Sequence, residues 1–316
     1  MNESRKVVVV TGPTASGKTA CALRLAKSIG GEILSADSRQ VFRHMNIGTG
    51  KDLEEYGTVP YHLIDIRDPD EEFSVSDFRR CALLALRCIL RKGKYPIVCG
   101  GTLYYIKALI DNYRFDHPPT NPRYSGRLEK RDREELYAAL KECELWNGHH
   151  WERDSKRRMA RAIEKAQTAK RGKPDVEEEY CYPTRIYYPL FERKQLKERI
   201  GRRLRERLRG GMVEEVSALL EMGIRRSRLE RFGLEYRWIL RHLEGELSFG
   251  EMERKLYVEI CRFSKRQSTF LRYLERSGHR LTPFGSFDEL LTDVKRWIAE
   301  PGASGGSRPT ASAPKN

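Results

Sequence analysis

The residues with the most recognisable chemistry lie close to the N-terminus, in a short glycine-rich stretch. It reads G-P-T-A-S-G-K-T and fits the phosphate-loop pattern of glycine, four residues, glycine, lysine, and serine or threonine. In such a loop, backbone N–H groups and a helix N-terminus point at one small volume that suits phosphate oxygens. Lys18 adds a point charge, and the Thr19 hydroxyl is placed to hold Mg²⁺. The predicted phosphate-binding residues are Gly12, Pro13, Thr14, Ala15, Ser16, Gly17, Lys18 and Thr19.

Two flanking segments have to position this loop. Residues 7–10 are four valines, too short and too β-branched a run for a helix, and they predict a buried parallel strand. Residues 20–29 carry apolar side chains at helical spacing, beginning with Cys21 and Leu25. The order strand, loop, helix favours a true phosphate loop over a chance match. It leaves open whether the phosphates belong to ATP, GTP or another compound.

A second candidate group follows the next predicted strand, residues 32–36. There the sequence reads Asp37-Ser38-Arg39-Gln40. A carboxylate just past the C-terminal end of a parallel strand lies at the same sheet edge as the phosphate loop, where open α/β sheets bind ligands. Asp37 is therefore a candidate catalytic residue, and the alternative is an N-cap for a following helix. The next segment, residues 47–51, has the composition of a flexible basic loop.

The alternation of strands and helices continues beyond this point. Residues 61–65 and 95–99 predict two more strands, with a helix between them that Ser74 or Ser76 caps. Gly100-Gly101-Thr102 follows the second of these strands and precedes another helix. Two glycines before a threonine let the backbone approach a ligand closely, and an ordinary strand-to-helix turn explains them equally well.

From about residue 117 the character of the sequence changes. Prolines interrupt the pattern, and the residues that follow read as charged helices without strands, which predicts an inserted helical subdomain. Within it, Arg157, Arg158 and Arg161 lie close together on one helix. They are candidate contacts for a polyanion, and a solvated helix face is the alternative.

The chain is expected to return to the sheet at residues 184–190 and then to become helical and strongly basic. A helix from about Glu192 carries nine lysines and arginines up to Arg209. Residues 231–236 are expected to open another helix.

The longest helix is predicted over residues 249–276. Lys265, Arg266 and Arg272 lie beside its buried stripe, where they can meet phosphates. The stripe consists of Met252, Leu256, Ile260, Phe263, Gln267, Phe270 and Leu274.

The charge balance indicates a class of partner. The 316 residues include 60 Lys and Arg against 45 Asp and Glu, a formal charge of +15. Such an excess points first to nucleic acid and then to anionic membranes or polyanionic small molecules, and a generic basic surface is the alternative. Charged residues at 33% and apolar residues at 39% are typical of a globular protein.

The cysteines and the N-terminus indicate a compartment. Seven scattered cysteines, without a Cys-x-x-Cys motif, are typical of reduced core residues in a cytosolic protein. His149-His150 alone do not make a zinc site. The first strand begins too early for a signal peptide to precede it, and no apolar stretch approaches membrane-spanning length. We therefore expect the protein in the cytoplasm.

Together these elements predict an α/β fold, a P-loop NTPase-like parallel sheet flanked by helices, with an inserted all-helical subdomain. Residues 1–116 and 184–299 are expected to form the catalytic core with its C-terminal helices, and residues 117–183 the insertion. Residues 300–316 are rich in Gly, Ser, Pro and Ala and are expected to be disordered.

Five motifs, taken in order, resemble the tRNA dimethylallyltransferases, also called isopentenyl-tRNA transferases. They read G-P-T-A-S-G-K-T, A-D-S-R-Q-V-F with I-G-T-G-K, H-L-I-D-I-R-D-P, G-G-T with a following tyrosine, and S-K-R-Q-S-T-F-L-R. This family transfers a dimethylallyl group from dimethylallyl diphosphate to N6 of the adenosine just 3′ of the anticodon. The resemblance implies that the phosphate loop, with Mg²⁺, holds the diphosphate of an isoprenoid and that tRNA is the acceptor. It also implies a monomer that does not bind membranes.

The resemblance implies roles for individual residues. Asp37 takes the position of the general base, Thr102 lies near the reacting amine, and Arg203 reaches the diphosphate. An adenine amine is a poor nucleophile because its lone pair is delocalised into the ring, so a carboxylate that accepts its proton helps the attack. The implied tRNA contacts are Asp37, Ser38, Arg39, Gln40, Arg157, Arg158, Arg161, Gly233, Lys265, Arg266, Gln267 and Arg272.

Four residues depart from the usual pattern of this family. Phe42 and Leu234 replace tyrosines, Leu103 stands where glycine is frequent, and Phe270 replaces a tryptophan. None of the four is a residue expected to carry the chemistry.

Two other classes of protein share parts of the pattern. A phosphate-loop kinase of a nucleotide or small metabolite has the loop, an Asp after the second strand and an arginine-rich insertion, but it does not account for the basic helical half or the linked motifs. An RNA-binding GTPase or ATPase switch would need Asn-Lys-x-Asp or a helicase-type acidic box, and the sequence has neither.

Overall fold

Short apolar runs between glycine-rich turns build a parallel sheet in the larger of two units. The computed structural model describes residues 6–113, 122–143, 156–168 and 179–301. The larger unit comprises Met1–Asp111 and Tyr180–Asn316, and the smaller unit comprises Asn112–Glu179.

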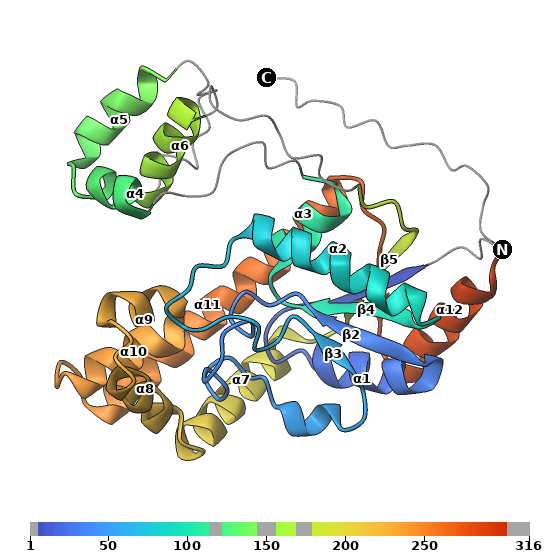
Figure 1. Cartoon of the computed structure of the whole chain (residues 1–316). Helices are drawn as coiled ribbons and strands as arrows, with labels where there is room; N and C mark the ends of the chain where they lie inside the picture. The colour runs from blue at the N-terminus through green and yellow to red at the C-terminus, as the bar shows by residue number, and fades with distance from the viewer. Residues whose placement is uncertain (1–5, 114–121, 144–155, 169–178, 302–316) are drawn as a thin grey trace. The chain divides into compact units, whose positions relative to one another are not determined.

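Six strands form the sheet in the order β3-β2-β4-β1-β5-β6, and every neighbouring pair is parallel. This arrangement confirms the predicted α/β class (Figure 1). The strands are β1 (Val7–Thr11), β2 (Gly31–Ser35), β3 (Tyr61–His62), β4 (Tyr95–Gly100), β5 (Thr184–Pro189) and β6 (Leu281–Phe284).

Two strands differ from the prediction. Strand β3 has only two residues instead of the five expected at 61–65, because Leu63 and Asp65 adopt positive φ values of 64° and 54°, outside the extended region. Strand β6 was not predicted. It is a short edge strand with a proline at position 283, and proline is tolerated at a sheet edge.

The register brings the ends of three central strands to one edge of the sheet. Thr11 of β1 pairs with Gly100 of β4, and Ser35 of β2 pairs with Cys99. The segments that leave these strands therefore start side by side, which is the edge where open parallel sheets bind ligands.

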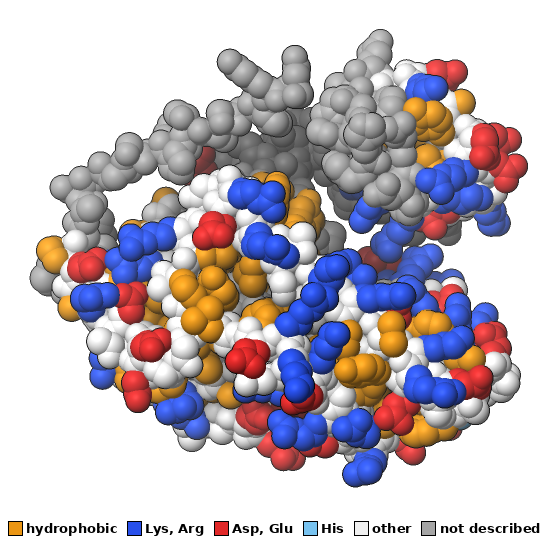
Figure 2. Space-filling model, turned by 180° about the vertical axis from the view of Figure 1, so that it is seen from behind, with side chains coloured by type: hydrophobic (Ala, Val, Ile, Leu, Met, Phe, Trp, Pro, Cys, Tyr) orange, Lys and Arg blue, Asp and Glu red, His pale blue; other side chains and the backbone are white. Residues whose placement is uncertain are grey.

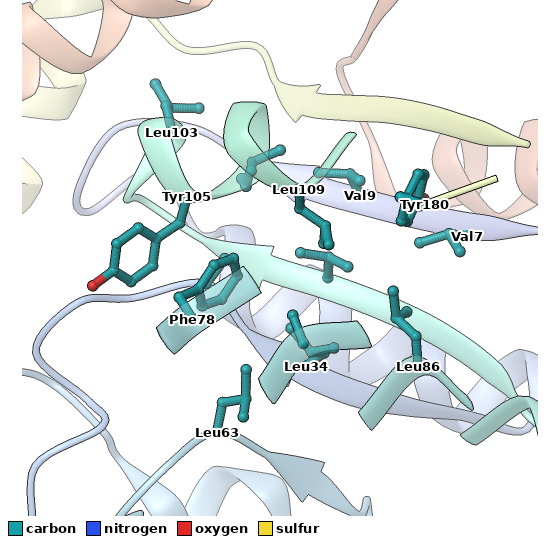
Figure 3. Close-up of a cluster of buried hydrophobic side chains, with 14 of the residues drawn as sticks. Val7, Val9, Leu34, Leu63, Phe78, Leu86, Leu103, Tyr105, Leu109 and Tyr180 are labelled. Atoms are coloured by element: carbon teal, nitrogen blue, oxygen red, sulfur yellow. The ribbon is translucent and has the colours of Figure 1, made fainter. Parts of the chain in front are cut away.

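Helices cover both faces of the sheet (Figure 1). One face packs against α1 (Lys18–Ile29) and α12 (Phe287–Ala299). The other packs against α2 (Val75–Arg91) and α3 (Leu103–Ile110), where Phe78 and Tyr105 stack with ring centroids 4.3 Å apart (Figure 3). Burying an aromatic or leucine side chain of this kind contributes roughly 1.5–3 kcal/mol.

Ser74 confirms the predicted start of α2. Its hydroxyl accepts from the Asp77 N–H while the Asp77 carboxylate accepts from the Ser74 N–H, a capping box. A 3₁₀ turn, η1 (Leu53–Tyr56), follows the loop after β2.

The basic C-terminal part forms a helical bundle beside the sheet. It consists of α7 (Arg193–Arg209), α8 (Met212–Glu221), α9 (Arg226–Phe232), α10 (Leu234–Leu243) and the long α11 (Phe249–Arg276), and it buries its own apolar cluster. Helix α10 begins at Leu234, within the segment 231–236 that was predicted to open a helix, and Gly233 with φ 149° separates it from α9.

The buried stripe of α11 is partly different from the prediction. Ser264 and Leu271 are buried in it, whereas Phe263 is 41% exposed and Phe270 is half-buried. The prediction placed an aromatic residue in the stripe at these two steps, and in each case the next residue in the sequence faces the core instead.

The described part of the smaller unit is helical. Helices α4 (Pro122–Glu129), α5 (Arg133–Lys141) and α6 (Lys156–Thr168) enclose a small core. That core comprises Leu128, Leu136, Leu140, Met159, Ala160 and Ile163. His149-His150 lie outside the described residues, as do residues 302–316 of the expected disordered tail.

The seven cysteines are all free, as predicted. Cys99 is buried, and Cys21, Cys81, Cys143 and Cys261 are partly buried against the hydrophobic clusters. Cys88 and Cys181 are exposed, so the expectation of core cysteines was wrong for these two. Within the residues that the structure describes, no helix has the length and apolar character needed to cross a bilayer.

Candidate active site

The glycines of the phosphate loop have the conformations that the motif requires. Gly17, with φ 86°, turns the chain into α1, and Gly12 has φ 150°. A Cβ on Gly12 would lie 3.0 Å from Ser16 Oγ, so the loop closes tightly. Lys18 Nζ lies back over the loop, 3.3 Å from the carbonyl oxygen of Pro13. The ammonium is thus held at the volume that the loop encloses.

Charged neighbours surround Lys18. Burial lowers the pKa of Lys18, and the positive charges of Arg203 and Arg207 lower it further, while Asp37 opposes this. Positive groups gathered in this way favour a bound anion.

The loop also contains three hydroxyls, and two of them, those of Ser16 and Thr19, adjoin the start of α1. Ser16 Oγ is buried and has no hydrogen-bond partner among the described residues. The Thr19 hydroxyl lies near the thiol of Cys99, whose pKa burial raises to about 11. In the described part of the chain, no group of three or more His, Cys, Asp or Glu is suited to a metal ion. The hydroxyls of Ser16 and Thr19 still fit Mg²⁺, because this ion takes few ligands from the protein and the rest from phosphate oxygens and water.

Asp37 lies at the sheet edge but caps no helix. Residues 38–51 form turns, and Asp37 Oδ1 accepts a hydrogen bond of 2.9 Å from the N–H of Arg39. The N-cap alternative is therefore wrong, because this carboxylate closes a turn of its own.

Thr102 is tied directly to the Asp37 turn. Its Oγ1 accepts from the Ser38 N–H at 3.0 Å, and its own N–H donates to the carbonyl oxygen of Ala36 at 3.2 Å. The two segments that leave β2 and β4 are thus joined, and Asp37 and Thr102 belong to one constellation.

The two glycines before Thr102 serve different purposes, and each corresponds to one of the two explanations that the sequence left open, a tight turn and space for a ligand. A Cβ on Gly100 would lie 2.2 Å from the carbonyl oxygen of Ala36, so this glycine is required by packing in the turn. A Cβ on Gly101 would lie 2.6 Å from Gln267 Nε2 and 3.6 Å from Lys18 Nζ. The second glycine therefore keeps space beside the phosphate loop.

Gln267 connects the long helix to both loops. Its Oε1 accepts from the Thr14 N–H at 2.8 Å, and its Nε2 donates to the carbonyl oxygen of Gly101 at 3.0 Å. The side chain is buried. Sequence reasoning grouped Gln267 with the RNA contacts and did not foresee this connection.

Two arginines of α7 face the loop. Arg203 Nη2 and Arg207 Nη2 lie 3.3 Å and 3.0 Å from the carboxylate Oδ2 of Asp52. Arg207 and Asp52 were missed by sequence reasoning. The spacing of four residues, which puts Arg207 on the same helix face as Arg203, was the available signal.

The loop between β2 and β3 is held firmly, so the prediction of a flexible basic loop at 47–51 was wrong. Lys51 is buried, and its ammonium is paired with Asp65. The carboxylate of Glu215 accepts from the N–H groups of Asn46, Ile47 and Gly48 at 2.7, 2.6 and 3.0 Å. Successive N–H groups of this kind form an anion-binding nest, and here a side chain of the protein fills it.

Gln40 helps to hold the same loop. It accepts from Ser35 Oγ at 2.9 Å and donates to the carbonyl oxygen of Gly50 at 3.0 Å. Its amide is therefore engaged between the end of β2 and the loop.

Arg39 and Gly233 meet at the junction of α9 and α10. The Arg39 guanidinium lies 6.0 Å from the Phe232 ring centroid, and a Cβ on Gly233 would lie 4.0 Å from Arg39 Nε. Burial lowers the pKa of Arg39 and raises the pKa of the neighbouring Glu235. The expected tRNA contact Gly233 thus adjoins the Asp37 turn.

The remaining predicted tRNA contacts lie on two helices. Lys265, Arg266 and Arg272 are exposed on α11, where a surface hollow is lined by Arg262, Lys265, Arg266, Thr269, Phe270 and Tyr273. On the face shown in Figure 2, Lys and Arg side chains gather across the middle of the larger unit.

In the smaller unit, the three candidate arginines lie on α6. Arg157 and Arg158 are exposed, and Arg161 is paired with Glu164 at 2.7 Å.

The four departures have defined surroundings. Phe42 is buried edge-on to Phe232, with ring centroids 4.8 Å apart, and Leu103 is buried in the core beneath α3. Leu234 is half-buried at the start of α10, and Phe270 meets Tyr273 edge-on at 5.3 Å.

Comparison with known proteins places the chain in a family. The family model described as IPP transferase matches residues 40–273. The chain belongs to the IPP transferase family. It is therefore an enzyme, a prenyltransferase, and the kinase alternative is not favoured. The phosphate loop and Asp37 lie before the residues that the IPP transferase model matches.

Individual relatives agree with this assignment to the IPP transferases. The tRNA dimethylallyltransferase 2 of Trichlorobacter lovleyi is 43% identical over 282 residues, which cover 88% of this chain and 91% of that protein. A crystal structure of the full-length tRNA isopentenylpyrophosphate transferase from Bacillus halodurans has a TM-score of 0.68 at 31% identity, and the match covers 93% and 96% of the two chains. A eukaryotic dimethylallyltransferase crystallised acting on tRNA has a TM-score of 0.73 at 23% identity over 94% of this chain and 78% of its own, a likeness of fold.

Proposed function

We propose that this enzyme transfers a dimethylallyl group from dimethylallyl diphosphate to N6 of the adenosine 3′ of the anticodon in tRNA. Besides the family, one observation supports the proposal most. A carboxylate, a threonine hydroxyl and a phosphate loop share one sheet edge, because Thr102 Oγ1 accepts from the Ser38 N–H beside Asp37 and the Gly101 turn adjoins Lys18.

Asp37 is the general base in this reaction. The N6 lone pair attacks C1 of the dimethylallyl group while the bond from C1 to the diphosphate oxygen breaks, and the N6 proton passes to the Asp37 carboxylate. Thr102 lies beside the same turn, where its hydroxyl orients the amine. The reaction yields N6-dimethylallyladenosine and diphosphate.

The phosphate loop and Arg203 hold the departing diphosphate. Donors aimed at the oxygens on which charge develops stabilise the transition state more than the ground state. Residues 12–19 supply backbone N–H groups, and Lys18 supplies a positive charge that burial and the neighbouring arginines disfavour and a bound diphosphate would stabilise. Mg²⁺, bound through the Thr19 hydroxyl and phosphate oxygens, would neutralise part of the charge of the leaving group.

The tRNA contacts follow the basic surfaces and the Asp37 turn. Exposed Lys265, Arg266 and Arg272 suit backbone phosphates, as do the arginines of α6 in the helical insertion at 117–183. Ser38, Arg39, Gln40 and Gly233 lie around the Asp37 turn, and Gln267 joins α11 to the phosphate loop. The target adenine has to leave its stack to reach Asp37. A monomer suffices for this arrangement.

The test is transfer of label to RNA. Unmodified tRNA, Mg²⁺ and dimethylallyl diphosphate with a labelled isoprenoid are incubated with the enzyme, and label in the RNA is counted. We expect incorporation at one adenosine per tRNA, absent with Asp37→Asn. Saturable ATP turnover without incorporation would refute the proposed function and would favour the alternative, a phosphate-loop kinase.

A further inference from the structure

Arg207 shares its surroundings with Arg203. It follows Arg203 by one helical turn, and both guanidinium groups reach the same Asp52 carboxylate. The Arg207 side chain is 17% exposed and that of Arg203 36% exposed, so Arg207 is the more enclosed of the two. A small cavity of about 30 Å³ lies between them and the loop. Its lining comprises Thr14, Ala15, Ile200, Arg203, Leu204, Arg207, Met212, Glu235 and Ile260.

The main chain leaves room for both guanidinium groups at Gly50. A Cβ at this position would lie 2.0 Å from Arg207 Nη2 and 2.5 Å from Arg203 Nη2. Gly50 also has φ +66°, a conformation that other residues rarely adopt. The backbone therefore admits the two arginines side by side, in van der Waals contact with it.

The positive charges of Arg203, Arg207 and Lys18 outnumber the negative charge of Asp52. Arg203 and Arg207 share the single negative charge of Asp52, and Lys18 lies near enough for both arginines to lower its pKa. Glu235 also faces Arg207, and burial raises the pKa of Glu235 while Arg207 opposes that rise. A site with several cations at a phosphate loop is suited to a ligand with more than one negative charge.

We propose that Arg207 is a second arginine that binds the diphosphate, and that Asp52 is a positioning residue that holds Arg203 and Arg207 toward the phosphate loop. The inference rests on the proposed function, in which this loop holds the diphosphate of the donor. Arg207 donates to phosphate oxygens alongside Arg203, and two guanidinium groups share the charge that develops as the C–O bond breaks. In the opposing reading, Arg207 only neutralises the carboxylates of Asp52 and Glu235.

The test measures binding of inorganic pyrophosphate, with Mg²⁺ present, by isothermal titration calorimetry. The variant Arg207→Gln removes the charge and keeps a polar side chain. The matched control, Arg209→Gln, makes the same change at an exposed position two residues later on α7. We expect the dissociation constant to rise about tenfold for Arg207→Gln, the loss of one charge-assisted hydrogen bond, and to stay within about twofold for the control.

A second titration, with an anticodon stem-loop RNA, tests whether Arg207 binds the diphosphate or a phosphate of the RNA backbone. Arg207→Gln should leave RNA affinity within about twofold of the wild type. Unchanged pyrophosphate affinity would limit Arg207 to neutralising Asp52 and Glu235. Loss of RNA affinity, with or without an equal loss for pyrophosphate, would assign Arg207 to the RNA backbone. Either result overturns the proposal.

Two substitutions at Asp52 test the positioning role. Asp52→Asn keeps an oxygen that accepts from both arginines, and Asp52→Ala removes it. We expect Asp52→Ala to raise the pyrophosphate dissociation constant several-fold and Asp52→Asn to restore most of the affinity. Tighter pyrophosphate binding by both variants would show that Asp52 competes with the ligand for the arginines. Unchanged pyrophosphate affinity in both variants would show that Asp52 has no role in binding. Both results overturn the positioning role.

Pyrophosphate binding requires neither transfer nor RNA. If the wild type transfers no label but Arg207→Gln weakens pyrophosphate binding, the proposed function fails and the assignment of Arg207 as a diphosphate ligand stands.

Discussion

The two sides of the proposed phosphate site are held in different ways. On the sheet side, the binding groups are backbone atoms, shaped by the left-handed Gly17 and joined to the Gly101 turn through Gln267. On the helix side, the binding groups are the ends of long arginine side chains that a single carboxylate, Asp52, holds. The first side is in place before a ligand arrives, whereas the second can exchange Asp52 for phosphate oxygens.

This difference predicts which property a substitution on each side of the site should change. Backbone donors that are already ordered cost little reorganisation when charge develops. Arginine side chains lose conformational freedom when they bind, and they gain charge-assisted hydrogen bonds in return. Substitutions on the sheet side should therefore reduce the rate or the stability, and substitutions on the helix side should mainly reduce diphosphate affinity.

The largest effect is expected on the sheet side, at Asp37. Asp37→Asn keeps the size of the side chain but removes the proton acceptor, so the rate of transfer should fall by about 10²–10⁴-fold. Affinity for tRNA should stay within about twofold, because no phosphate contact is lost. Single-turnover transfer and filter binding measure the two quantities. Turnover near that of the wild type would refute Asp37 as the base.

On the helix side, Arg203→Gln should lower kcat/KM by about 10²-fold, because one donor to the leaving diphosphate is lost. The melting temperature should change little, since the side chain is 36% exposed. Steady-state kinetics and thermal unfolding check both. Arg202→Gln, at an exposed neighbouring position, is the control and should behave as the wild type. Equal losses in the two variants would show a general charge effect.

The link between helix and loop predicts a change of stability. Gln267→Ala leaves the Thr14 N–H and the carbonyl oxygen of Gly101 without their partner, and a buried group without a partner costs about 1–3 kcal/mol. We expect a lower melting temperature together with slower transfer. Thr269→Ala, exposed on the same helix, is the control. A variant with wild-type stability would remove Gln267 from the support of the loop.

The smallest effect is expected in the helical insertion, which carries none of the residues assigned to the chemistry. Arg157→Ala with Arg158→Ala should weaken tRNA binding several-fold and reduce the slope of log affinity against log salt by about 1.4–1.8, the value for two phosphate contacts. Binding titrations at several salt concentrations measure it. The control pair, Lys130→Ala with Arg131→Ala, removes the same charge from exposed positions of the same unit. An unchanged slope would make the α6 arginines a solvated surface.

Most of the sheet could be predicted because its signals are local. Four valines predict β1, and the serine that caps α2 is followed three residues later by the Asp that completes its capping box. Strand β6 escaped prediction because L-T-P-F has no alternation and contains a proline, which only its position at the sheet edge makes acceptable. The basic loop at 47–51 was misjudged because the carboxylate that holds it, Glu215, lies far away in the sequence.

The sequence by itself determined the phosphate loop, the strand ends that carry Asp37 and Thr102, and the family resemblance. These depend on backbone conformation and on residues close together in the chain, so their types and spacing are sufficient. Only the tertiary structure decided which of the nine basic residues of α7 face the loop. Helical periodicity defines a face but not what lies opposite it, and here that is Gly50 with Asp52, more than 150 residues from the arginines in sequence. A long side chain takes its position from such distant neighbours, whereas a backbone loop takes its shape from its own residues.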